Sequence, residues 1–354
     1  MDHDMKNLSK RELEAYCGDL SQAFGIQECV LEGGKAKGTK AYIVNNGCGL
    51  EMTVLADKCF AIPKMSFKGD NVGFISKTGI CAPEFFQEEG TRGFLRNFEA
   101  GFLTTCGLTY VGTPGVEDGQ PNGLHGVISN TPIEHASSKV EWDGDKAWLV
   151  LNGHAREGYL FGPNLEIRRD IRMNTKENKL WIHDEVENHG FDTQPLMLLY
   201  HFNMGYPMLD RSCKVYTNYD KIVPRDPHSA EGMEDCEQFL DPIDGYEEKV
   251  YFRSVSDESV KKGYVLLHNE NLQKAVLIHL DPEALPVLNQ WNSPRSGDYA
   301  LGLEPGTAHV GGRIRAKEDG SLKYIEPGEV KTFDIEVEFI DCTTENEKLS
   351  AFIK

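Results

Sequence analysis

The feature that most constrains the fold is the alternation of apolar and charged side chains over residues 165–173, which read LEIRRDIRM. Successive side chains of a β-strand point to opposite faces of a sheet, so a period of two predicts a strand with one buried face and one wet face. The polar residues 174–179 predict a turn into a second strand over residues 180–186. The two segments together predict a β-hairpin.

The same pattern recurs towards the C-terminus. Residues 264–268 and 275–280 predict another hairpin, and residues 333–339 alternate apolar and acidic side chains after a Pro-Gly turn. Many strands and few helices predict an antiparallel all-β protein. Because the chain has 354 residues, we expect a large sandwich of two broad sheets and not a small barrel.

A short N-terminal helix is the main expected departure from β-structure. Ser9 and Glu12 have the spacing of a capping box, and the apolar residues from Leu13 to Phe24 recur with a helical period. We therefore expect an N-terminal helical segment over residues 1–29 and a single β-sandwich domain over residues 30–354. Residues 223–244, rich in Pro, Asp and Glu, predict a long surface excursion within that domain.

The net charge and the cysteine content argue against several classes of binding partner and covalent or metal cross-link. A formal net charge of -19 without a long Lys/Arg cluster argues against binding to nucleic acids or anionic membranes. Nine cysteines without any C-x-x-C pair indicate reduced thiols, with no disulfide framework and no cysteine zinc site. No apolar segment approaches a membrane span, and the N-terminus lacks the apolar part of a signal peptide. We expect a cytoplasmic protein, with a homo-oligomer left open.

The stretch at residues 196–210, LMLLYHFNMGYPMLD, is the first candidate for function. Its first five residues predict a strand buried on both faces, and His201 and Asn203 follow where the apolar run stops. An imidazole and a carboxamide at the mouth of a rigid strand are held in place and can face a cavity. The alternative is a structural His201 that bonds only to a backbone carbonyl.

Two earlier stretches combine polar residues with glycines. Arg96 is the only strong cation within residues 94–108, and its planar guanidinium could bind a sugar hydroxyl pair or a carboxylate. The alternative is a structural ion pair with Glu99 or another acid. His125 lies between Gly123 and Gly126, which indicates a sharply bent loop and makes this histidine a site candidate.

The fourth stretch covers residues 289–312. Glu304 precedes a Pro-Gly pair at the predicted end of a strand, where a carboxylate can act as a general base. Trp291 could stack on sugar C–H groups while Gln290 bonds to hydroxyls, although a core tryptophan is the alternative. No H-x-H or H-E-x-x-H spacing joins any two candidates, so we expect no metal. We also expect no cofactor, because acid–base chemistry with two proton-transfer groups moves no electrons.

Four motifs give the chain a family resemblance. They are FLRNFEAGFLTTCGL, NGLHGVISNTP, LLYHFNMGYPMLD and GDYALGLEPG. In this order they resemble the aldose 1-epimerase (galactose mutarotase)-like superfamily, and most closely its DUF4432 branch. The resemblance covers residues 50–339 and implies a galactose mutarotase-like β-supersandwich with a concave sugar-binding face.

The resemblance also implies roles for individual residues. Glu304 in LGLEPG resembles the general base and His201 the general acid, while His125 and Arg96 resemble the residues that bind sugar oxygens. The motif around His201 is shorter than in mutarotases and lacks its first Asn. For His201 to begin protonated, its pKa should lie near or above neutrality, which Glu304 nearby would favour.

The expected function is therefore interconversion of the anomers of an aldose or sugar derivative, by ring opening with Glu304 as base and His201 as acid. Two alternatives stay open. The same pair could drive epimerisation or aldose-ketose isomerisation away from C1, possibly on a keto-sugar, or the chain could be a non-catalytic sugar-binding module.

Overall fold

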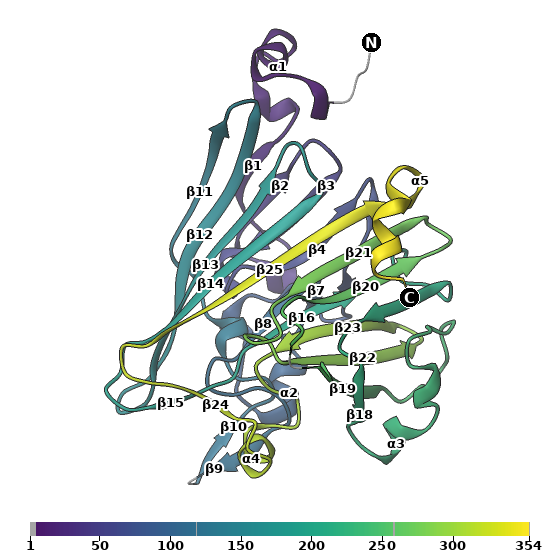
Figure 1. Ribbon diagram of the computed structural model, residues 1–354. Coiled ribbons are helices and arrows are strands. Elements are labelled where there is room, and N and C mark those ends of the chain that lie inside the picture. The colour runs from purple at the N-terminus through teal and green to yellow at the C-terminus, as the bar shows by residue number, and fades with distance from the viewer. Residues whose placement is uncertain (1–4, 118, 258, 354) are drawn as a thin grey trace.

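The computed structural model describes residues 5–117, 119–257 and 259–353 and consists of two large antiparallel sheets (Figure 1). The first sheet has 11 strands and carries the candidate site on its central strands. In spatial order these are β1 (Gly25–Val30), β2 (Lys40–Asn45), β3 (Leu50–Leu55), β4 (Ala61–Phe67), β8 (Leu103–Cys106), β16 (Leu199–Met204), β23 (Asp298–Gly306), β22 (Val287–Arg295), β19 (Lys249–Ser254) and β18 (Lys221–Pro224), with β5 (Asp70–Asn71) beside β4.

The second sheet has eight strands and packs against the inner face of the first. Its strands, in spatial order, are β11 (Glu134–Asp143), β12 (Lys146–Gly158), β13 (Asn164–Asn174), β14 (Lys179–Asn188), β25 (Val330–Asp341), β21 (Lys274–Leu280), β20 (Gly263–Asn269) and β17 (Cys213–Thr217). This architecture confirms the all-β sandwich of two broad sheets with a short N-terminal helix.

Short elements complete the described chain. Three two-stranded sheets pair β6 (Phe74–Ile75) with β7 (Ala100–Gly101), β9 (Gly115–Glu117) with β10 (Gln120–Asn122), and β15 (Gln194–Leu196) with β24 (Lys323–Ile325). The α-helices are α1 (Lys10–Tyr16), α2 (Gly90–Leu95), α3 (Pro227–Ala230), α4 (Arg313–Glu318) and α5 (Cys342–Glu345). Among the described residues, no helix has the length and apolar character needed to cross a bilayer.

The predicted strands and the predicted helix start are confirmed. The alternating segments form β13, β14, β20, β21 and β25. The capping box is formed, with the Ser9 amide bonded to the Glu12 carboxylate at 2.8 Å. The helix is shorter than expected, however, because it ends at Tyr16, and β1 already begins at Gly25. The predicted boundary after residue 29 therefore falls within the first sheet.

Strand β16 runs further than predicted. His201 and Asn203 were expected beyond its end, but both lie within it. The strand continues because its neighbour β23 pairs with it as far as Met204. Period-two alternation then sends Tyr200 and Phe202 into the core between the sheets, and His201 to the opposite face. The polar residues belong to a rigid strand of the first sheet and not to a loop.

A buried ion pair joins the two sheets behind β16. Arg169 of β13 bonds Asp184 of β14 through two contacts, Nε–Oδ1 at 2.8 Å and Nη2–Oδ2 at 2.5 Å. The same guanidinium donates to the Thr105 hydroxyl at 2.7 Å and the Cys59 carbonyl at 3.0 Å, both in the first sheet's half of the sandwich. The Tyr200 hydroxyl donates to Asp184 at 2.6 Å. Each polar group of this fully buried cluster is therefore hydrogen-bonded.

We expect Asp184→Asn to destabilise the fold by about 3–5 kcal/mol, because it leaves the buried Arg169 charge without its counter-ion. Urea unfolding measures this. The matched control is Asp170→Asn, which removes the carboxylate of a partly exposed pair with Arg172 on β13 and should cost about 1 kcal/mol or less. Equal stability losses in the two variants would contradict a sheet-joining role for the Arg169–Asp184 pair.

Candidate functional site

A cavity of about 880 Å³ lies on the outer face of the first sheet, over β16, β22 and β23. These three strands are neighbours in the sheet (Figure 1). The cavity's largest apolar side chains are aromatic, namely Phe74, Phe94, Phe98, Tyr246 and Trp291. An apolar wall with a few convergent polar groups is the usual form of a small-molecule site.

His201 and Glu304 meet at the floor of this cavity. They come from adjacent antiparallel strands, and the pairing of Phe202 with Leu303 places them opposite one another. His201 Nε2 lies 3.3 Å from Glu304 Oε1, and both side chains are almost fully buried. His201 Nδ1 has no hydrogen-bond partner among the described residues. The pair can therefore exchange protons with a ligand that enters the cavity.

Gly302 makes room for the Glu304 carboxylate. It lies two residues earlier on β23, and so on the same face of the sheet. A Cβ atom at Gly302 would lie 2.3 Å from Glu304 Oε1 and 3.0 Å from Trp291 Cβ, closer than side chains tolerate. The absence of a side chain at residue 302 therefore determines where the Glu304 carboxylate rests.

Burial favours the neutral forms of both floor residues. It raises the pKa of Glu304 well above 4.5, and the nearby charge of Glu248 raises it further. It lowers the pKa of His201 well below 6.5, with His125 adding to this effect. The expectation that His201 has a pKa near or above neutrality is therefore wrong, because desolvation and the effect of His125 outweigh the hydrogen bond of Asn203, which alone raises this pKa.

His125 faces the same cavity from a bent loop. Its φ of +60° confirms the sharp turn predicted from the neighbouring glycines. Burial lowers its pKa to about 4, so the ring is neutral at pH 7. Nδ1 accepts a hydrogen bond from the Gly112 amide at 3.3 Å, which assigns the proton to Nε2. His125 can therefore donate a hydrogen bond to a ligand oxygen.

Trp291 connects the floor of the cavity to its rim. Its ring lies 5.9 Å from that of His201, and its indole N–H donates to Glu248 at 2.7 Å. Arg225 donates to the same Glu248 carboxylate at 3.0 Å. Arg225 belongs to the predicted surface excursion, and Glu248 lies just beyond it, so this segment forms part of the cavity wall.

Three predicted site residues do not line the cavity. Arg96 is largely exposed and forms an ion pair with Glu89 at 2.8 Å, so it has the structural role that was the alternative to ligand binding. Asn203 is buried beside the site and donates to the His201 carbonyl at 2.8 Å. Gln290 lies on the opposite face of β22 from Trp291 and bonds Arg253 at 2.8 Å. The structure thus brings together Glu304, His201, His125 and Trp291 from the predicted set.

Sequence reasoning missed the aromatic wall contributed by α2 and the segment that follows it. Phe94 and Phe98 stack at 4.7 Å, and Phe98 lies 5.1 Å from the His201 ring. Phe94 lies in α2, and Phe98 follows four residues later, beyond the end of the helix, whereas Arg96, the C-cap residue between them, is exposed and does not line the cavity. The pair of aromatics at that spacing was the signal that could have identified this wall.

Comparison with known proteins places the chain in a family. The family model described as Domain of unknown function (DUF4432) matches residues 36–339. The chain belongs to this family. Comparison with curated protein sequences gives no match.

Solved structures similar to this DUF4432 protein share its fold. A proposed aldose 1-epimerase from Klebsiella pneumoniae has a TM-score of 0.86 at 23% identity, over 92% of this chain and 87% of that one. A galactose mutarotase-like protein from Clostridium acetobutylicum has a TM-score of 0.64 at 15% identity, over 90% and 99%. A galactose 1-epimerase from Lactobacillus acidophilus has a TM-score of 0.57 at 13% identity, over 90% and 99%.

We expect Glu304→Gln to gain stability relative to the wild type as the pH rises above about 4.5. Above this pH the unfolded chain releases the Glu304 proton, while the raised pKa keeps it bound in the folded protein, so wild-type stability falls. Glutamine removes this loss, which grows by up to about 1.4 kcal/mol per pH unit until the folded carboxyl ionises.

Urea unfolding of both proteins between pH 4 and pH 8 tests this expectation. Glu247→Gln is the control for removing an exposed carboxylate from the same cavity wall. If the difference in the free energy of unfolding between Glu304→Gln and the wild type does not change with pH, the folded protein does not hold the Glu304 proton more tightly than the unfolded chain does.

Proposed function

We propose that this DUF4432 protein interconverts the anomers of an aldose or aldose derivative by opening and reclosing the sugar ring. The observation that carries the proposal is the 3.3 Å approach of Glu304 to His201 at the floor of an aromatic cavity. Ring opening needs a base for the anomeric hydroxyl and an acid for the ring oxygen. Two neighbouring proton-transfer groups meet that need.

In the proposed mechanism, the Glu304 carboxylate removes the proton of the anomeric hydroxyl while the His201 imidazolium protonates the ring oxygen. The C1–O5 bond breaks to give an aldehyde, rotation about C1–C2 exchanges its faces, and reversed proton transfers close the ring as the other anomer. The neutral and the ionised forms of the Glu304–His201 pair differ only in which of the two residues carries the shared proton. Sugar oxygens that hydrogen-bond both groups favour the ionised pair that begins the reaction.

The other cavity residues orient the sugar. The neutral His125 ring donates from Nε2 to a sugar oxygen, and Trp291 and Phe98, whose rings both lie near that of His201, offer apolar faces to sugar C–H groups. Orientation of this kind contributes to the rate because ring opening requires both proton transfers in one geometry.

We expect Glu304→Gln to lower the catalysed rate of anomer interconversion by about 10²- to 10⁴-fold, since an amide cannot accept the proton. Polarimetry or NMR exchange spectroscopy with a panel of aldoses measures the rate, after a thermal-shift screen selects sugars that stabilise the wild type. Near-normal turnover in a folded Glu304→Gln variant would contradict the assignment. Binding of a sugar by the wild type without any rate enhancement would indicate a non-catalytic module.

Epimerisation or isomerisation away from C1 is the second candidate, because His201 and Glu304 lie side by side and could both act at carbons next to a carbonyl. Proton NMR in D₂O separates the reactions. Anomer interconversion through ring opening exchanges no carbon-bound hydrogen, whereas enediolate chemistry exchanges the hydrogen at the reacting carbon. Deuterium at C2 would therefore favour the second candidate.

We expect Gly302→Ala to lower activity by roughly 10²-fold while the protein stays folded, because the added methyl group displaces the Glu304 carboxylate. Gly33→Ala is the matched control, since its Cβ would meet no atom within 4 Å and its φ of -93° suits alanine. Steady-state kinetics and a crystal structure of Gly302→Ala check the effect. An unmoved carboxylate with wild-type activity would contradict it.

A further inference from the structure

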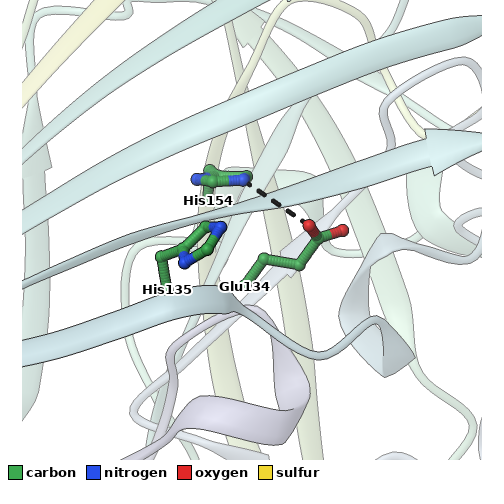
Figure 2. Close-up of side chains that lie close together, drawn as sticks. All are labelled: Glu134, His135 and His154. Atoms are coloured by element: carbon green, nitrogen blue, oxygen red, sulfur yellow. Dashed lines mark ion pairs between the residues drawn. The ribbon is translucent and has the colours of Figure 1, made fainter.

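A second cluster of polar side chains lies on the second sheet, away from the cavity. Glu134 and His135 of β11 and His154 of β12 point toward one another (Figure 2). One nitrogen or oxygen atom from each residue lies within 4.8 Å of the others. His154 Nε2 is 3.7 Å from Glu134 Oε2, and the two imidazole centroids are 5.3 Å apart.

A β-bulge creates this cluster. Glu134 pairs with His154 and Ser137 pairs with Asn152, so two residues of β11 lie opposite the single Gly153. His135, the first of these two, has a φ of +53°. In a regular strand, Glu134 and His135 would point to opposite faces, but a bulge redirects one side chain. Here it brings two successive side chains beside His154.

The ligand atoms of the cluster are available. In the described part of the chain, none of the three side chains makes a hydrogen bond, and His154 forms only long ion contacts with Glu134 and with Glu166, the latter at 3.9 Å. A second His/Glu group differs in this respect. There Glu336 is bonded by Lys179 at 2.6 Å and by Trp181 at 2.9 Å, so that its carboxylate is already occupied.

We propose that Glu134, His135 and His154 bind a divalent transition-metal ion of the zinc class. Two imidazole nitrogens and one carboxylate oxygen form a typical zinc ligand set, whereas Mg²⁺ and Ca²⁺ prefer oxygen ligands throughout. Zinc bonds of about 2.0–2.2 Å in a tetrahedron place ligand atoms about 3.3–3.6 Å apart, close to the 3.7 Å between His154 and Glu134. Small rotations of these exposed or half-exposed side chains close the site, and water takes the fourth position.

The metal ion would stabilise the pairing of two strands at one edge of the second sheet. β11 is the terminal strand of the eight-stranded sheet, and its pairing with β12 is interrupted at the bulge beside His135. A bound ion joins the two strands at that interruption. The cluster does not line the aromatic cavity, so this role is independent of the proposed sugar chemistry.

The test uses the full-length protein, stripped of metal with a chelator and kept reduced. Isothermal titration with ZnCl₂ and visible absorption with CoCl₂ measure stoichiometry and affinity. His135→Asn suits the left-handed backbone at residue 135, and His154→Gln keeps the side-chain size. His228→Ala is the control, because His228 is a partly exposed histidine on α3, outside the cluster.

We expect the wild type to bind one more equivalent of zinc than either cluster variant, His135→Asn or His154→Gln. If a variant still binds this zinc ion, we expect its affinity to be at least roughly 10-fold lower than that of the wild type. Zinc should raise the melting temperature of the wild type and of His228→Ala with concentration, and leave the two cluster variants unchanged. Zinc binding that is the same in all four proteins would overturn the proposal, as would a wild type that binds no zinc at about 1 mM.

Discussion

The Arg169–Asp184 ion pair determines how the two sheets meet. A buried guanidinium is costly without a carboxylate and further acceptors, so β13 and β14 pack only where Thr105 and Tyr200 of the first sheet complete the network. Tyr200 is thereby held toward the interior. Since neighbours in a strand point to opposite faces, holding Tyr200 inward directs His201 outward to the cavity floor. The position of the candidate acid thus depends on a salt bridge on the far side of its own strand.

Local pattern was sufficient to predict most of the fold. The alternation of apolar and charged residues identified strands of the second sheet because one face of that sheet is buried and the other is solvated. β16 was harder, since both of its faces are buried and its polar residues imitate a strand end. His201 and Glu304 could still be identified from motifs, but their 3.3 Å approach depends on strand pairing across residues about a hundred apart, which no local pattern contains.

Features that depend on the direction of a side chain were the least predictable. Arg96 was the expected ligand of its motif, yet Phe94 and Phe98 line the cavity, while Arg96 at the C-terminal end of α2 is exposed and pairs with Glu89. Glu134 and His154 are 20 residues apart in sequence, without the spacing of a known metal motif. Only the register of β11 against β12, with its bulge, brings them together. Such irregularities of pairing leave no trace in apolar periodicity.

The electrostatics of the cavity link its rim to its floor. Glu248 is held at the rim by the indole of Trp291 and the guanidinium of Arg225, and its charge reinforces the effect of burial in raising the pKa of Glu304. A neutral Glu304 avoids leaving an isolated charge in a dry, aromatic site. A ligand that brings hydroxyl groups to the floor supplies the hydrogen bonds that an ionised carboxylate requires. In the proposed mechanism, occupancy of the cavity therefore favours proton transfer, and the segment that walls the cavity contributes to this effect through Glu248.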